Sequence, residues 1–215
     1  MTLTGSPLDV SPVIPVVVLN DPARAASLAR ALLTGGIGII EVTLRTPGAL
    51  ACVAAIAQQV PEIALGVGSV LTTDHIRLSL AAGAEFLVSP GASPPLLENL
   101  VEARVPVLPG VATVSEVLAA SDYGLTELKF FPAGPAGGPG YLAAIGGPVP
   151  HVRFCPTGGV TVANMQDYLV LSNVAAVGGT WLTPPRLVEA EDWHAITALA
   201  EAAVTSLAFT SPPYP

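Results

Sequence analysis

Residues 37–68, IGIIEVTLRTPGALACVAAIAQQVPEIALGVG, hold two short β-branched segments separated by an Ala-rich one. Residues 37–44 and 63–68 are apolar on both faces, as in the strands of a buried parallel sheet. Residues 47–59 between them have the composition of a helix, and the Thr46–Pro47 pair is typical of a helix start. The stretch therefore predicts a strand–helix–strand unit with parallel strands.

The same alternation continues in both directions along the chain. Further strands are expected at 13–19, 85–89, 105–110, 126–131, 152–156 and 174–179, and further helices at 21–34, 72–82, 93–103, 113–122, 138–146, 161–171 and 184–206. Eight such units fit a single-domain (β/α)8 barrel, the TIM barrel. A doubly wound open sheet is the competing fold, but the first strand–helix junction, residues 20–26, lacks the glycine-rich dinucleotide fingerprint.

We expect the barrel domain to span residues 12–206. Residues 1–11 then form an N-terminal leader, and residues 207–215 form a Pro-rich C-terminal tail that cannot extend the last helix. This tail is either a frayed end or a strap that lies on a neighbouring subunit.

Composition indicates a compact globular chain, because 51% of the residues are hydrophobic and only 11% are charged. No apolar run approaches the roughly 18 residues that a membrane span requires, and the N-terminus has neither basic residues nor an apolar core, so it is no secretory signal. These absences favour a cytoplasmic location without membrane partners. The net charge of −8 argues against nucleic-acid binding, so an anion site must be built locally.

Metal binding is not expected. Cys52 and Cys155 are about a hundred positions apart and form neither a metal-type spacing nor a disulfide framework. The three histidines, His75, His151 and His194, are scattered along the chain.

Lys129 is the one lysine of the chain, and it falls on the predicted strand 126–131. Side chains alternate along a strand, so Lys129 and Phe131 share a face. An amine among apolar groups is desolvated, which frees its lone pair to attack a carbonyl. A lysine that reaches from a strand end to water is the structural alternative. We predict that Lys129 is a catalytic amine.

Glu41 stands in the middle of the apolar strand 37–44, where a carboxylate is costly unless it is paired or protonated. Such a group suits proton transfer. A structural ion pair with Arg45 or Lys129 is the alternative, and the two roles are compatible. Arg45 carries the planar fork that suits a carboxylate or phosphate, although a solvated loop arginine is common.

Two Gly-Gly pairs follow the seventh and eighth predicted strands, at Gly158-Gly159 and Gly178-Gly179. Barrels often bind a substrate phosphate in these loops through backbone N–H groups. Glycine lets the backbone approach an anion closely, and Thr157 and Thr180 add hydroxyl donors. The sequence thus indicates a phosphate site there, with plain turn glycines as the alternative.

Seven segments resemble, in order and spacing, the family of 2-keto-3-deoxy-6-phosphogluconate (KDPG) aldolases over residues 12–205. They are Glu41–Thr46 (EVTLRT), Gly66–Leu71 (GVGSVL), Ser89–Gly91 (SPG), Asp122–Gly124 (DYG), Lys129–Ala133 (KFFPA), Arg153–Gly159 (RFCPTGG) and Gly178–Leu182 (GGTWL). The resemblance implies a cofactor-independent class I aldolase of the Entner–Doudoroff pathway, usually a homotrimer, that yields pyruvate and glyceraldehyde 3-phosphate.

The resemblance also implies roles for individual residues. Lys129 would form the imine and Glu41 would act as general acid and base. Arg45 and Ser69 would hold the pyruvate carboxylate, Pro90 and Phe131 would shape the pocket around the imine, and Thr157 would border it. Gly158, Gly159, Gly178, Gly179 and Thr180 would take the phosphate.

Three features depart from the family pattern. Ser69 replaces a common Thr and Thr180 a common Ser, so both hydroxyls remain. The loop 134–140 is unusually rich in Gly and Pro, which could change the grip on the aldehyde end. Alternative substrates are the galactonate epimer, 2-keto-4-hydroxyglutarate and an unphosphorylated acid. Alternatives of another class are a phosphate-binding barrel isomerase or epimerase and a non-catalytic sugar-phosphate binder.

Overall fold

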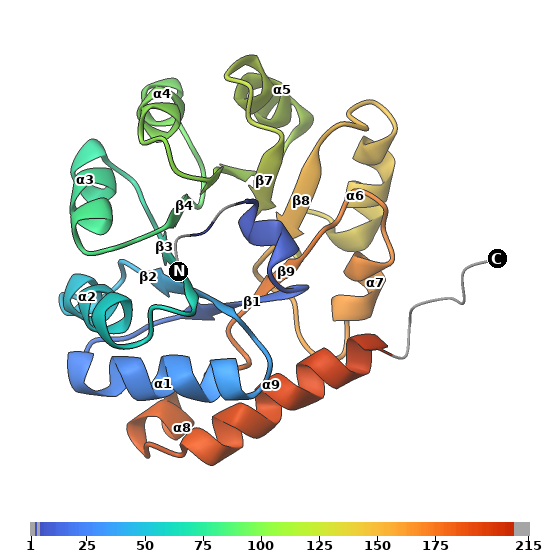
Figure 1. Cartoon of the computed structure of the whole chain (residues 1–215). Helices are drawn as coiled ribbons and strands as arrows, with labels where there is room; N and C mark the ends of the chain where they lie inside the picture. Colours follow the sequence, from blue (N-terminus) through green and yellow to red (C-terminus); the bar gives the residue numbers. More distant parts are fainter. Residues whose placement is uncertain (1–2, 4, 209–215) are drawn as a thin grey trace.

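The chain folds into alternating strands and helices, with the strands inside and the helices around them (Figure 1). The structure is a computed structural model that describes residue 3 and residues 5–208. The predicted tail lies, from residue 209 onward, outside the described residues. No helix in the described part of the chain combines the length and hydropathy needed to cross a bilayer.

The strands are β1 (Val13–Val17), β2 (Ile39–Thr43), β3 (Ala64–Gly68), β4 (Phe86–Val88), β5 (Val107–Leu108), β6 (Gly110–Val111), β7 (Glu127–Phe130), β8 (Arg153–Pro156) and β9 (Val177–Gly179). The helices are η1 (Pro7–Asp9, a 3-10 turn), α1 (Pro22–Thr34), α2 (Ala49–Gln59), α3 (Thr73–Ala81), α4 (Pro94–Glu102), α5 (Val114–Asp122), α6 (Gly138–Gly146), α7 (Met165–Leu169), α8 (Pro185–Glu189) and α9 (Trp193–Ala208).

All strand pairs are parallel, which confirms the predicted α/β class, but they form two sheets instead of one. The order is β5-β4-β3-β2-β1-β9 in the larger sheet and β6-β7-β8 in the smaller. The predicted strand 105–110 is divided at Pro109, which has no N–H for the sheet ladder. On the other side, the isolated bridges Phe154↔Val174 and Thr157↔Gly178 are the only strand pairings among the described residues that connect β8 with residues 174–179.

The strands are apolar on both faces because both faces are covered. Every residue of β1, β2 and β3 is buried, and the helices pack their Ala- and Leu-rich faces against the outer side of the sheets. This agrees with the two-sided apolar pattern of a parallel sheet.

The sequence has the pattern of a helix start at Asp21, Thr46, Ser93 and Thr113, and two of these residues cap a helix through their side chains. Asp21 accepts a hydrogen bond from Ala23 N, and Thr113 with Glu116 forms a full capping box. Ser93 makes no side-chain capping bond. The Thr46 hydroxyl donates to Leu19 O instead of capping, and α2 begins later, at Ala49.

Two predicted helices are shorter or divided. The segment 161–171 is helical only over α7, and 184–206 is divided into α8 and α9. The division falls at Glu191, whose φ of 55° lies in the left-handed region, and Asp192 then accepts a hydrogen bond from Ala195 N. Periodicity alone does not reveal a one-residue break of this kind.

The N-terminal segment packs against the amino-terminal ends of β7 and β8. The Ser6 hydroxyl donates to Glu127 Oε2 at 2.6 Å, Arg153 Nη1 donates to Glu127 Oε1 at 2.9 Å, and Arg153 also pairs with Asp9. Leu8 of η1 is buried and belongs to the main core. The segment therefore covers the end of the strands opposite to the loops described next.

Candidate active site

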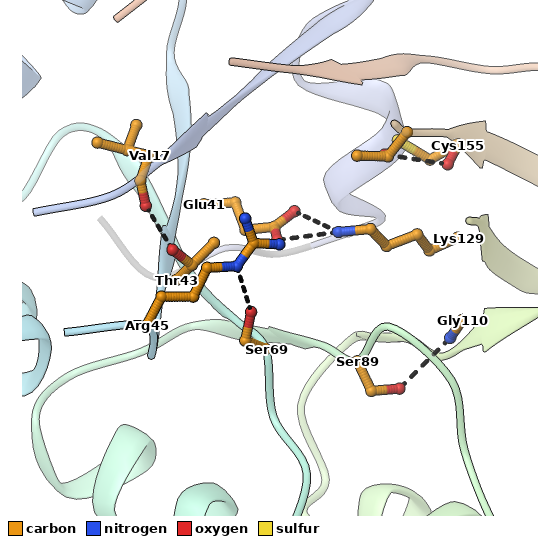
Figure 2. A network of polar contacts seen from close by, with 10 residues as sticks. Val17, Glu41, Thr43, Arg45, Ser69, Ser89, Gly110, Lys129 and Cys155 are labelled. Carbon is orange, nitrogen blue, oxygen red and sulfur yellow. Dashed lines mark hydrogen bonds and ion pairs between the residues drawn. The ribbon is translucent and has the colours of Figure 1, made fainter. Parts of the chain in front are cut away.

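Lys129 and Glu41 meet in the interior, although they come from different sheets. Lys129 on β7 is 4% exposed and Glu41 on β2 is 3% exposed. Lys129 Nζ donates to Glu41 Oε1 at 3.0 Å and to Oε2 at 3.4 Å (Figure 2). Because an isolated buried charge is costly, each group stabilises the burial of the other.

Phe131 lies beside the amine, on the face predicted from strand alternation. Lys129 Nζ is 5.6 Å from the centroid of the Phe131 ring. The ring shields the amine and also attracts it when it is a cation.

Arg45 and Ser69 form a polar pair just beyond the ends of β2 and β3. Arg45 Nε donates to Ser69 Oγ at 3.2 Å (Figure 2). Within the described part of the chain, the two terminal nitrogens of this guanidinium have no protein partner, so they are available to an anion. Ser69 has a φ of 60°, a left-handed conformation uncommon outside glycine. The backbone of Ser69 is thus held in an unfavourable conformation at the residue whose hydroxyl accepts the hydrogen bond from Arg45.

Thr157 and Cys155 line the wall formed by β8. Both side chains are buried, and Thr157 Oγ1 lies 4.0 Å from Cys155 Sγ. A Cβ on Gly178 would lie 2.3 Å from Thr157 Oγ1, so the glycine makes room for this hydroxyl. Burial raises the pKa of the Cys155 thiol to about 12, although the nearby Lys129 charge lowers it in part. The thiol is therefore neutral beside the amine.

The four glycines of the predicted phosphate site lie together, at the carboxyl ends of β8 and β9. The isolated bridge Thr157↔Gly178 joins the two strand ends. Gly158 and Gly159 have φ values of 90° and 83°. Among the described residues, their N–H groups have no acceptor. Thr180 follows β9 and is exposed.

Pro90 follows β4 and packs against the start of β6. A Cβ on Gly110 would lie 2.2 Å from the carbonyl carbon and oxygen of Pro90, so only glycine permits this approach. The buried Ser89 hydroxyl accepts from Gly110 N at 3.3 Å (Figure 2). These contacts join the two sheets where Pro109 interrupts the ladder.

One residue beside the amine was not among the sequence-predicted site residues. Cys155 is the register partner of Lys129. Strand alternation would have placed Cys155 and Thr157 on one face. The strand register, which a single sequence does not give, was needed to place Cys155 beside Lys129.

These groups can carry out imine chemistry. A buried amine can attack a ketone, the adjacent carboxylate can move protons, and the open guanidinium can receive an anion. Among the described residues, no group of three or more His, Cys, Asp or Glu side chains is placed to hold a metal ion. The fold and the site together define an enzyme of the lyase class, a class I (Schiff-base) aldolase.

Comparison with known proteins identifies the family. The family described as "KDPG and KHG aldolase" matches residues 5–199. The chain belongs to this family. It is 47% identical to the KHG/KDPG aldolase of Escherichia coli K12 over 203 residues, which cover 94% of this chain and 95% of the relative.

Two solved structures have the same fold. One is the KDPG aldolase of Legionella pneumophila with pyruvate captured at low pH as a covalent carbinolamine intermediate. It has a TM-score of 0.90 and 43% identity, covering 92% of this chain and 96% of that one. The other is the KDPG aldolase of Zymomonas mobilis ZM4 with 3-phosphoglycerate, with a TM-score of 0.87 and 40% identity over 92% of both chains.

Proposed function

We propose that the protein catalyses the reversible cleavage of KDPG to pyruvate and glyceraldehyde 3-phosphate through an imine on Lys129. The observation that carries this proposal is the direct contact of 3.0 Å between the buried Lys129 Nζ and Glu41 Oε1. The pyruvate carbinolamine captured in the Legionella relative supports the same first step.

The reaction follows from these two groups. The ammonium of Lys129 passes a proton to Glu41, and the free amine attacks the C2 ketone to give a carbinolamine, which loses water to form a protonated imine. Glu41, through a water molecule, removes the proton of the C4 hydroxyl. The electrons of the C3–C4 bond then flow into the imine, which releases the aldehyde and leaves an enamine. Protonation at C3 and hydrolysis release pyruvate and restore the amine.

The pyruvate half of the substrate would lie between β2, β3 and β7. Arg45 and the Ser69 hydroxyl bind its carboxylate, since two guanidinium nitrogens have no partner among the described residues and Nε already donates to Ser69 Oγ at 3.2 Å. Phe131 and Pro90 shape the apolar part of this pocket, and Thr157 borders it. These surroundings exclude water from the imine.

The phosphate would lie over the ends of β8 and β9. Gly158 and Gly159 offer N–H groups that have no acceptor among the described residues, Gly178 and Gly179 allow close approach, and Thr180 adds an exposed hydroxyl. This site needs no lysine, which accords with a chain of net charge −8. The Zymomonas relative with 3-phosphoglycerate supports a phosphorylated ligand.

We further infer that the two sheets are arcs of one closed eight-stranded barrel in the 12–206 domain. Pro109 alone separates β5 from β6, its carbonyl accepts from Lys129 N at 3.0 Å, and Thr157↔Gly178 bridges the other seam.

We also propose a cytoplasmic homotrimer, on the family resemblance. Light scattering coupled to size exclusion tests the assembly, and a mass of one or two chains would contradict it.

2-Keto-4-hydroxyglutarate is a second candidate substrate, because the E. coli relative is a KHG/KDPG aldolase. It lacks a phosphate, so it would use the lysine and arginine sites without the glycine loops. Comparing kcat/KM for KDPG, its galactonate epimer and 2-keto-4-hydroxyglutarate ranks them. A clear preference for an unphosphorylated acid would contradict the proposed phosphate site.

Trapping tests the central chemistry. Borohydride added with pyruvate should attach one reduced pyruvyl unit to Lys129, located by peptide mapping, since the only other amine of the sequence is the α-amino group. Lys129→Ala should lose both the adduct and turnover. An adduct elsewhere, or substantial turnover by the variant, would overturn the proposal.

A further inference from the structure

Two glycines on one face of β3 leave room for side chains that come from neighbouring strands. Gly66 and Gly68 are two residues apart, so they share a face. A Cβ on Gly66 would lie 2.1 Å from the Phe86 ring, and a Cβ on Gly68 would lie 2.0 Å from Glu41 Oε1. The space beside Gly66 is therefore filled by the Phe86 ring, and the space beside Gly68 is filled by the Glu41 carboxylate.

We propose that Gly68 is a positioning residue that keeps the Glu41 carboxylate within reach of Lys129. This inference rests on the proposed function, because it concerns the proton transfers assigned to Glu41. Gly68 would act on the reaction only indirectly, because its lack of a side chain leaves room for the Glu41 carboxylate.

The register explains the contact. Glu41 pairs with Gly66, and Thr43 with Gly68. The Glu41 side chain therefore extends along its strand in the carboxyl-terminal direction and lies over the next inward position of β3. From there its Oε1 meets Lys129 Nζ at 3.0 Å (Figure 2).

The contact is too close for small adjustments. A Cβ at position 68 would also lie 2.7 Å from Glu41 Cδ and 2.8 Å from Cγ, so three atoms of one side chain would overlap with it. The backbone at Gly68 is held in the sheet, and its carbonyl accepts from Leu44 N at 2.9 Å. The Glu41 side chain can rotate, whereas the backbone of Gly68 is fixed by the sheet. An added methyl group would therefore displace the carboxylate.

Position 66 provides a matched comparison. A methyl group there would push on the Phe86 ring, which is fully buried in the core. Gly66→Ala should therefore lower stability through packing. Gly68→Ala should instead change the chemistry, because its three nearest contacts are all with Glu41.

The experiment compares the rates of the proton transfers with the final extent of imine formation. For Gly68→Ala we expect kcat for KDPG cleavage to fall at least about tenfold, because general acid–base catalysis contributes about 10²–10⁴-fold. The exchange of pyruvate methyl protons in D2O should fall in parallel. Borohydride trapping of pyruvate on Lys129 should be slower, because Glu41 also takes the proton of the ammonium, but it should reach the same final extent as in the wild type. Wild-type exchange and turnover in Gly68→Ala would overturn the inference.

The Glu41→Ala background shows whether the effect passes through Glu41. Adding Gly68→Ala there should change the residual rate less than about twofold, because its steric partner is gone. An equal loss in both backgrounds would overturn the inference. If Gly68→Ala alone does not fold, the double variant should fold, and a double variant that also fails would overturn it. Failure of the wild-type chain to trap pyruvate would instead refute the proposed function.

Discussion

Cys155 and Lys129 are partners in the parallel register of β7 and β8, so a thiol and an amine occupy adjacent positions on one buried face. Burial raises the pKa of the Cys155 thiol, and this effect is larger than the opposite effect of the Lys129 charge, which lowers the pKa. The thiol is therefore uncharged at neutral pH, and Glu41 remains the partner of the amine.

The two buried thiols should make stability fall at alkaline pH. Burial raises the pKa of Cys155 from 9.0 to about 12 and that of Cys52 from 9.0 to about 11. Above pH 9 the unfolded chain loses these protons first, so each thiol lowers the free energy of unfolding by up to about 1.4 kcal/mol per pH unit. Urea titrations from pH 8 to 11 measure the slope. The double variant Cys52→Ala/Cys155→Ala should have a shallower slope, and an unchanged slope would contradict this account.

Removing one charge of the buried pair should destabilise the protein more than removing both. Lys129→Met leaves the Glu41 carboxylate buried without a partner, which costs about 3 kcal/mol of unfolding free energy. Adding Glu41→Gln should restore more than half of that loss, while both variants remain inactive. Urea unfolding at pH 7 provides the measurement. Equal stability of the two variants would show that the pair is not held away from water.

Arg45→Lys should weaken pyruvate binding, because lysine keeps the charge but loses both the fork and the Nε contact with Ser69. In the aldol direction the KM for pyruvate should rise about tenfold or more, as expected for the loss of a charge-assisted hydrogen bond. The KM for the aldehyde should change much less. Arg77→Lys, which alters an exposed pair with Asp74 on α3, is the control. An unchanged KM for pyruvate would remove Arg45 from the carboxylate site.

Leu8→Ala should affect stability and not catalysis. Leu8 is 3% exposed and belongs to the segment that packs against the amino-terminal ends of β7 and β8. A cavity of this kind costs about 2–4 kcal/mol, which would lower the urea midpoint, while kcat at 25 °C should equal that of the wild type. Loss of activity in the folded variant would indicate coupling between the two ends of the strands.

The sequence was sufficient for features that depend on local chemistry. The β-branched segments predicted the parallel strands, and the Thr113–Glu116 pair predicted its helix start. Lys129 and Glu41 stood out because charges are rare in apolar strands, and the structure brings them together.

Features that depend on register or on a single backbone angle were not predictable in this way. The division of the last predicted helix at Glu191 and the packing of η1 against the amino-terminal end of β7 arise from tertiary contacts. The space left by Gly68 is visible only once Glu41 lies over it. The interruption at Pro109 could have been predicted, since a proline in a central strand lacks a ladder donor.

The presence of a single lysine in the sequence has a practical consequence. Lysine labelled with ¹⁵N in its side chain would introduce a single observable nitrogen into the whole chain, at position 129. Ammonium, carbinolamine and imine would each give a distinct NMR resonance of that atom, free of overlap, so the progress of the bond-forming steps could be followed directly in solution.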